Sequence, residues 1–358
     1  MLPTLPQLLR FATDNGASDL HISAGQPPLV RVHGDLRRLE LAALSPADAR
    51  KLIYEAMSDE QRRTFTERLE LDFSFAVAEQ RFRVNAFMQN RGPGAVLRSI
   101  PSAIPSLGDL ALPEVVRRLA EQEKGLVLVT GPTGSGKSTT LAAMIDHINS
   151  SEPGHILTLE DPIEFVHTSK RCLINQREIG QQSKSFGIAL RSALREDPDV
   201  ILIGELRDLE TTSLAMTAAE TGHLVLATMH TSSAPKTVDR IMDMYPAEQQ
   251  GQIRSMLSES LLGVLSQMLV KKRGGGRVGV LEILVGTPAV RNLIREGKTH
   301  QIPSTMQVAG KSGMQTMEMA LSNLVTRGVI ELAEARARMP SSEVLAAMQR
   351  NAPAGAGP

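Results

Sequence analysis

A glycine-rich segment of eight residues has the types and spacing that most clearly predict chemistry in this sequence. Residues 131–138 read Gly-Pro-Thr-Gly-Ser-Gly-Lys-Ser, which matches the full phosphate-loop pattern G-x-x-x-x-G-K-[ST]. The apolar run 125–130 predicts a buried strand before the loop, and residues 138–146 predict a helix after it. Glycines let such a backbone wrap a phosphate chain with its N–H groups turned inward. The segment therefore predicts a site for a nucleoside triphosphate.

Two side chains of this loop have predicted roles of their own. Lys137 is expected to contact the β and γ phosphates, and the Ser138 hydroxyl is expected to ligate Mg²⁺. The alternative, a glycine-rich turn of purely structural use, does not account for the whole pattern between a strand and a helix. The predicted nucleotide-binding residues are Gly131, Pro132, Thr133, Gly134, Ser135, Gly136, Lys137, Ser138 and Thr139.

Acidic and histidine residues lie at the ends of three further predicted strands. Glu160 follows the strand at 155–159, Glu205 ends an apolar run like a Walker B strand, and His223 and His230 flank a third strand. Ligands of open α/β sheets bind at the carboxyl ends of strands, so these residues are candidates for a metal-associated acid and a water-activating base. Glu160 as a helix cap or salt-bridging acid remains open, and single histidines are more often packed or exposed at the surface.

Arginines of the first hundred residues could complete a phosphate site. Arg83 and Arg98 fall on two strands predicted to pair, with Arg81 and Arg91 near them. Solvated strand arginines are the ordinary interpretation. Arg83 and Arg98 could instead point together toward the phosphates of a neighbouring subunit, as arginine fingers do.

The surrounding elements predict two domains. The first hundred residues mix helical spacing with strands of period two, and Gly92-Pro93-Gly94 predicts a hairpin turn. Two prolines and a glycine within 101–108 break this pattern and predict a linker. From residue 113 short apolar strands alternate with helices, which predicts a parallel α/β sheet covered on both faces. Beyond Pro246 the pattern is mostly helical, with one hairpin at 273–277.

Composition excludes several classes of function. Lys plus Arg equals Asp plus Glu at 39 each, and aromatic residues make up 3%, so nucleic acid is not an expected partner. One cysteine excludes an internal disulfide framework and a four-cysteine zinc site. No signal peptide or membrane span is predicted, and the Pro/Gly-rich end of the chain is expected to be disordered.

Several motifs together resemble the secretion ATPases of type II secretion and type IV pilus machines. They are the loop 131–138, Leu-Glu-Asp-Pro-Ile-Glu-Phe at 159–165, Asn-Gln-Arg-Glu at 175–178, the segments 193–199 and 204–208, and Ala-Glu-Thr-Gly-His at 219–223 leading to 228–231. The resemblance implies a PAS-like α+β domain at 1–100, a linker at 101–112, a RecA-like ATPase domain with C-terminal helices at 113–345, and a disordered tail at 346–358.

The resemblance also implies roles for the candidate residues. Glu160 is expected to be the general base for water, Glu205 the acid associated with Mg²⁺, and His223 and His230 sensors of the γ phosphate. Arg83 and Arg98 match arginines that act in trans on a neighbour's ATP. The opening Ala-Ser-Asp-Leu-His at 17–21 and the segment 289–296 narrow the resemblance to the pilus-retraction branch, as do the missing zinc cysteines and the missing extra N-terminal domain.

A cytoplasmic homohexameric ring that hydrolyses Mg-ATP is the machine this resemblance implies. It is expected to act on the inner-membrane platform protein of the type IV pilus, to associate with the membrane only through partners, and to work beside a paralogous accessory motor. Two other classes remain open: a nucleic-acid translocase, which the balanced charge argues against, and a nucleotide-binding scaffold that hydrolyses little.

Overall fold

The computed structural model describes residues 2–32, 34–77, 80–100 and 103–350, with the side chains of 349 and 350 excepted. The chain forms two compact units. The first comprises residues 1–103 together with the short segment 162–166, and the second comprises 104–161 and 167–358.

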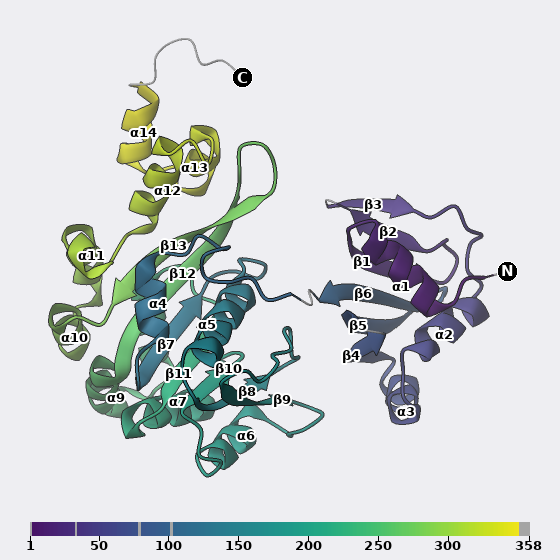
Figure 1. Ribbon diagram of the computed structural model, residues 1–358, viewed down its shortest axis with the longest axis horizontal. Helices are drawn as coiled ribbons and strands as arrows, with labels where there is room; N and C mark the ends of the chain where they lie inside the picture. The colour runs from purple at the N-terminus through teal and green to yellow at the C-terminus, as the bar shows by residue number, and fades with distance from the viewer. Residues whose placement is uncertain (1, 33, 78–79, 101–102, 351–358) are drawn as a thin grey trace. The chain divides into compact units, whose positions relative to one another are not determined.

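The N-terminal unit is a six-stranded antiparallel sheet with three helices (Figure 1). The strand order is β3-β2-β1-β6-β5-β4, and its core includes Leu20, Phe82 and Leu97 from the sheet and Leu9 and Leu52 from helices. The elements are α1 (Leu5–Asp14), β1 (Ala17–Ser23), β2 (Leu29–Val32), β3 (Asp35–Arg38), α2 (Pro46–Glu55), α3 (Asp59–Arg68), β4 (Glu70–Val77), β5 (Gln80–Gln89) and β6 (Gly92–Ile100).

The predicted turn at Gly92-Pro93-Gly94 is wrong by two residues. Gln89 pairs with Gly92 in the β5–β6 ladder, so the turn consists of Asn90 and Arg91. Gly94 instead lies within β6, where a Cβ would come 2.9 Å from a ring carbon of Phe87. This glycine serves close packing of an aromatic ring, which a sequence pattern does not distinguish from a turn.

The second unit is built on a seven-stranded sheet of order β13-β12-β7-β11-β10-β8-β9. Its strands are parallel except for the antiparallel hairpin β12–β13, which confirms the hairpin predicted at 273–277. The strands are β7 (Gly125–Thr130), β8 (Gly154–Glu160), β9 (Cys172–Glu178), β10 (Val200–Ile203), β11 (Leu224–Met229), β12 (Leu261–Lys271) and β13 (Arg277–Val285).

Both faces of this sheet are buried, as the continuous apolar strands predict. Alternate residues of β7 show the two layers: Leu126 and Leu128 pack with residues of α6 to α10, whereas Val127 and Val129 pack with α4 and α5. The helices that cover the sheet are α4 (Glu114–Ala120), α5 (Lys137–Ser151), α6 (Phe186–Ala193), α7 (Leu209–Thr221), α8 (Ala234–Asp243), α9 (Ala247–Ser260) and α10 (Pro288–Arg295).

The chain ends in short helices, coloured yellow-green to yellow in Figure 1. Leu321 and Leu345 of this region form a small core with Val270 and Val280 of the β12–β13 hairpin. The elements are η1 (Thr299–Gln301), α11 (Ile302–Val308), η2 (Gly310–Ser312), α12 (Met317–Thr326), α13 (Leu332–Arg338) and α14 (Glu343–Arg350). The mixed α/β class with C-terminal helices is thus confirmed.

The predicted tail begins too early at 346. Leu345 is fully buried and α14 continues to Arg350, because its apolar face packs on the small C-terminal core. The rest of the predicted tail, 351–358, lies outside the described residues. Among the helices that the structure describes, none is long and apolar enough to cross a bilayer.

Candidate nucleotide site

The phosphate loop joins the carboxyl end of β7 to the N-terminus of α5, as its pattern predicts. Gly131, Gly134 and Gly136 have φ angles of 140°, 76° and 90°, which only glycine adopts readily. Lys137 is buried, and its Nζ donates to the carbonyl oxygens of Gly131 at 2.9 Å and Pro132 at 3.1 Å. The ammonium group is therefore held over the loop that it is predicted to serve.

The N-terminus of α5 lacks the side-chain cap found on seven other helices of the described residues. Its N-cap is Gly136, which has no side chain that could accept from the first turn of the helix. The helices that do have such a cap begin after Ser45, Ser58, Ser185, Asp208, Ser233, Thr287 and Thr316. The first N–H groups of a helix point away from it and attract anions, so this end of α5 is suited to phosphate.

A buried polar layer behind the loop was missed by the sequence analysis. The Thr140 hydroxyl donates to Oε1 of Gln267 at 2.7 Å, and the hydroxyls of Thr130 and Ser266 lie 2.8 Å apart. Gln267 and Ser266 belong to β12, which pairs with β7 although more than 130 residues separate the two in sequence. In the sequence, β12 was indicated only by the predicted hairpin at 273–277, which requires a strand before the turn.

Glu160 ends β8, and its carboxylate accepts hydrogen bonds from Thr158 and Gln176. The Thr158 hydroxyl donates to Oε1 at 2.6 Å, and the side-chain amide of Gln176 donates to the same oxygen at 3.3 Å. Gly204 at the end of β10 comes close to it, since a Cβ there would lie 3.3 Å from the Glu160 Cα. The missing side chain at 204 lets the ends of β8 and β10 approach each other.

Glu205 follows β10 after Gly204, and its carboxylate lies close to two basic side chains. Its Oε2 lies 2.8 Å from Nη2 of Arg207 and 3.4 Å from Nε2 of His230. Burial by itself would raise the pKa of Glu205, but the hydrogen bonds and charges of Arg207 and His230 outweigh this and lower the pKa below its ordinary value. Glu205 is therefore a carboxylate at neutral pH, and it is brought together with His230 as predicted.

His223 lies at the other edge of the sheet. It precedes β11, whereas His230 follows it, and the phosphate loop lies at the carboxyl edge. Its ring Nδ1 is 3.0 Å from the Ala218 carbonyl oxygen at the end of α7. A six-residue strand spans about 20 Å, so His223 cannot contact a phosphate bound by the loop of its own subunit. Its predicted position beside the nucleotide is wrong.

Arg83 and Arg98 face each other across the β5–β6 ladder, where they are direct register partners. Nε of Arg98 donates to Oδ1 of Asp19 at 2.8 Å, and the Arg98 side chain remains 66% exposed while that of Asp19 is 6% exposed. Burial opposes the ionisation of Asp19, but hydrogen bonds from Ser18 and Arg98 outweigh it and lower its pKa. A buried carboxylate thus holds one exposed guanidinium of the predicted pair.

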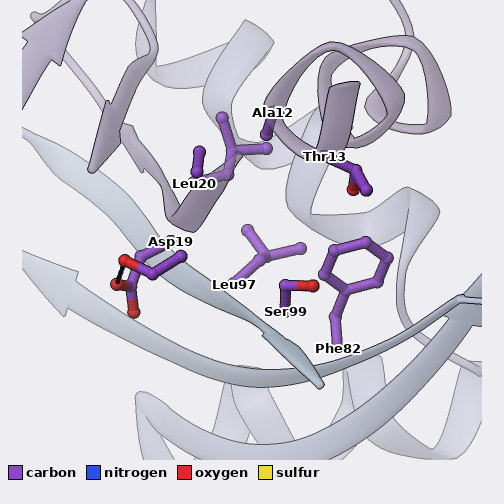
Figure 2. A pocket seen from close by; sticks show the side chains of 9 residues that line it. Ala12, Thr13, Asp19, Leu20, Phe82, Leu97 and Ser99 are labelled. Carbon is purple, nitrogen blue, oxygen red and sulfur yellow. Dashed lines mark hydrogen bonds between the residues drawn. The ribbon is translucent and has the colours of Figure 1, made fainter. Parts of the chain in front are cut away.

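The same aspartate borders a hollow under α1. Figure 2 shows Asp19 there with Thr13, Phe82 and Leu97, which close the hollow from the sheet and the helix. The hollow has no room for a ligand.

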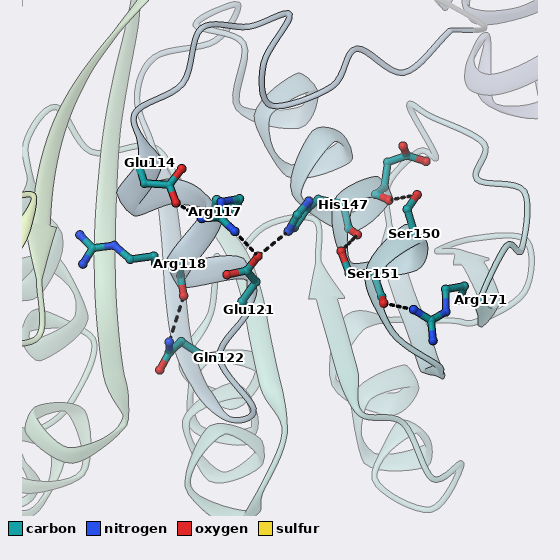
Figure 3. Close-up of polar contacts among 10 residues, drawn as sticks. Glu114, Arg117, Arg118, Glu121, Gln122, His147, Ser150, Ser151 and Arg171 are labelled. Carbon is teal, nitrogen blue, oxygen red and sulfur yellow. Dashed lines mark hydrogen bonds and ion pairs between the residues drawn. The ribbon is translucent and has the colours of Figure 1, made fainter.

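The helix that begins at the phosphate loop is tied to α4 by a polar network (Figure 3). Nε2 of His147 on α5 lies 3.0 Å from Oε1 of Glu121, and Nη1 of Arg117 lies 2.9 Å from the same oxygen. Arg117 also contacts Glu114. These groups are partly exposed, and such pairs contribute little to stability, so buried apolar contacts are the main anchor of α5.

The donor groups of the site fit Mg²⁺ bound together with a nucleotide. No cluster of three or more His, Cys, Asp or Glu side chains suited to a metal exists in the described part of the chain. A nucleotide-bound Mg²⁺ needs none, because phosphate oxygens and water supply most of its ligands. The Ser138 hydroxyl in the first turn of α5 and the ionised Glu205 are oxygen donors of the type this ion prefers.

The segment 289–296 forms most of α10 and its end. Val290 and Ile294 are buried against the core of the second unit, and Nε of Arg291 donates to the Gly286 carbonyl at 2.8 Å. Asn292 donates to Glu296 at 2.9 Å on the outer side. This segment therefore has one packed face and one polar face, and it belongs to no part of the nucleotide site described above.

A mainly parallel sheet with a phosphate loop after an inner strand, and acids at the carboxyl ends of other strands, defines a P-loop nucleotide-binding protein. Residues 2–274 match the family described as "Type II/IV secretion system protein". The type IV pilus retractation ATPase PilT of Pseudomonas aeruginosa is 58% identical over 94% of this chain and 99% of its own length.

Two further relatives agree with this match. The twitching motility protein of Neisseria gonorrhoeae is 57% identical over 88% of this chain and 85% of its own length. The crystal structure of the pilus retraction motor PilT with bound ADP has a TM-score of 0.89 at 47% identity, covering 98% of this chain and all of that one. The chain belongs to the type II/IV secretion system protein family, which confirms the family predicted from its motifs.

Proposed function

We propose that this chain is the ATP-hydrolysing subunit of a motor that retracts type IV pili. The observation that carries the proposal is the meeting of the phosphate loop, Glu160, Glu205 and His230 at the carboxyl edge of one sheet. The relatives named for pilus retraction and twitching motility support the biological role.

Each residue of the site has a defined task in hydrolysis. The loop N–H groups and Lys137 bind the β and γ phosphates, and Ser138 and Glu205 hold Mg²⁺, which neutralises phosphate charge. Glu160 accepts a proton from the attacking water while the new P–O bond forms and the bond between the γ phosphorus and the bridging oxygen breaks. The products are ADP and inorganic phosphate. His230, paired with Glu205, is placed to respond to loss of the γ phosphate.

A shared active site between subunits completes the mechanism. Arg83 and Arg98 of a neighbouring subunit stabilise the charge that develops on the γ phosphate. The subunits would form a homohexameric ring at the cytoplasmic face of the inner membrane. Closure of one shared site after another around the ring would act on the platform protein. A paralogous accessory motor would work beside this ring. Binding to the membrane occurs through these partners.

The variant Glu160→Gln tests the hydrolytic assignment. The amide keeps the shape of the side chain but accepts no proton, so turnover should fall about 10²- to 10⁴-fold while ATP binding persists. Unchanged turnover would reject Glu160 as the base. Negligible turnover in both the variant and the original chain would favour a scaffold role instead.

Two further measurements test the ring and the biological role. Specific ATPase activity should rise with protein concentration as subunits assemble, and a flat value in a proven monomer would reject the shared site. Deletion of the gene in its host should give hyperpiliated cells that do not twitch, whereas bald cells would indicate a role in pilus assembly.

A further inference from the structure

The side chain of Gln176 connects two functional parts of the second unit. Gln176 lies on β9 opposite Thr158 of β8, two residues before the end of both strands. Its amide Nε2 donates to Oε1 of Glu160 at 3.3 Å, and its Oε1 accepts from the backbone N–H of His167 at 2.8 Å. One side chain therefore bridges the proposed base and a backbone group seven residues further along.

The contact with His167 fixes which way the amide of Gln176 faces. A backbone N–H can only donate, so the oxygen of Gln176 must face it. The NH₂ group is then turned toward Glu160, and it cannot reverse without losing the bond to His167. With the Thr158 hydroxyl, it holds the same oxygen of the Glu160 carboxylate and so fixes the rotation of that group.

Glu160 and His167, the two hydrogen-bond partners of Gln176, lie on either side of a short segment of the chain. Residues 162–166 group with the N-terminal unit, while Asp161 and His167 on either side belong to the second unit. Glu160 is connected to one end of this segment through the chain at Asp161, and to the other end through Gln176 and His167. The base is thus linked to both ends of the segment.

We propose that Gln176 is a positioning residue that orients Glu160 for proton transfer and ties its orientation to the segment 162–166. This inference rests on the proposed role of Glu160. Gln176 is expected to contribute to turnover and not to ATP affinity, because the two hydrogen bonds described above join it to the proposed base and to a backbone group.

The variant Gln176→Glu separates this role from a structural one. A carboxylate at 176 still accepts from the His167 N–H but no longer donates to Glu160. We expect kcat for ATP to fall about 10- to 100-fold, since small misplacements of a catalytic group cost this much. The KM for ATP should stay within about twofold, as no phosphate contact changes. Asn175→Asp is the matched control, because it adds the same charge to β9 beside His155 and away from Glu160; Nδ2 of Asn175 lies 2.9 Å from Nε2 of His155. This control should keep the original kcat.

A double variant shows whether Gln176 acts through Glu160. If it does, Glu160→Gln with Gln176→Glu should have the residual turnover of Glu160→Gln alone, whereas a purely structural role would multiply the two losses. Gln176→Met, which adds no charge, repeats the test if Gln176→Glu folds poorly.

The outcomes separate this inference from the proposed function. Wild-type turnover in Glu160→Gln would remove the base and this inference with it. An inactive Glu160→Gln beside fully active Gln176→Glu and Gln176→Met would overturn the inference alone. A rise in KM with unchanged kcat would also overturn it.

Discussion

Two glycines of the phosphate loop offer a matched test of why the loop has its shape. Gly131 and Gly134 both have positive φ angles, of 140° and 76°. A Cβ on Gly131 would lie 2.2 Å from the carbonyl oxygen of Gln267 and 2.7 Å from Oγ of Ser135. A Cβ on Gly134 would meet nothing within 4 Å. Alanine at either position strains the backbone, but only at 131 does it also collide with β12.

The expected losses follow from these distances. A positive φ costs an alanine about 1–2 kcal/mol, which applies to both variants. A close carbon–oxygen contact is about 3.3 Å, so the Gly131→Ala variant must move β7 and β12 apart by about 1 Å. Forcing a methyl group into a packed region adds about 1–3 kcal/mol. The free energy of unfolding should fall by about 2–5 kcal/mol in Gly131→Ala and by about 1–2 kcal/mol in Gly134→Ala.

Urea unfolding of the nucleotide-free protein, followed by circular dichroism, measures both losses under the same conditions. The transition of the second unit should shift further in Gly131→Ala than in Gly134→Ala, and the affinity for ATP should be lost in the first variant. Equal shifts in the two variants would refute the contact between Gly131 and β12 as the reason for glycine at 131.

Three further changes test other parts of the structure. Asp19→Asn should destabilise the N-terminal unit by about 1–3 kcal/mol at pH 7. The pKa of Asp19 is lowered in the folded protein, so this stabilisation is present above the ordinary pKa of 3.8 and is lost as the pH falls through the folded pKa. The urea midpoints of the variant and the original chain should therefore converge in acid. Gln267→Leu should cost about 1–3 kcal/mol in urea unfolding, because the buried Thr140 hydroxyl loses its acceptor. Gly204→Ala should reduce kcat about tenfold with a melting temperature near the original, because a Cβ at 3.3 Å displaces Glu160 by a few tenths of an ångström.

Local sequence patterns were sufficient to predict the phosphate loop and most of the strands and helices around it, in their order along the chain. The loop 131–138, the strands that deliver Glu160 and Glu205, and the pairing that places Arg83 opposite Arg98 depend on residues close together in the chain. Their spacing dictates backbone conformation directly, through glycine at positive φ and through the alternation of buried and exposed positions.

Tertiary structure decided which distant segments lie beside those elements. Gln267 reaches the phosphate loop only because β12 pairs with β7, and Gln176 reaches Glu160 only because β9 pairs with β8. The direction of β11 puts His230, and not His223, at the edge of the sheet that carries the phosphate loop. Strand neighbours are chosen by burial of whole apolar faces across the sheet. No single segment contains that information, so the phosphate loop could be predicted from the sequence but its supporting side chains could not.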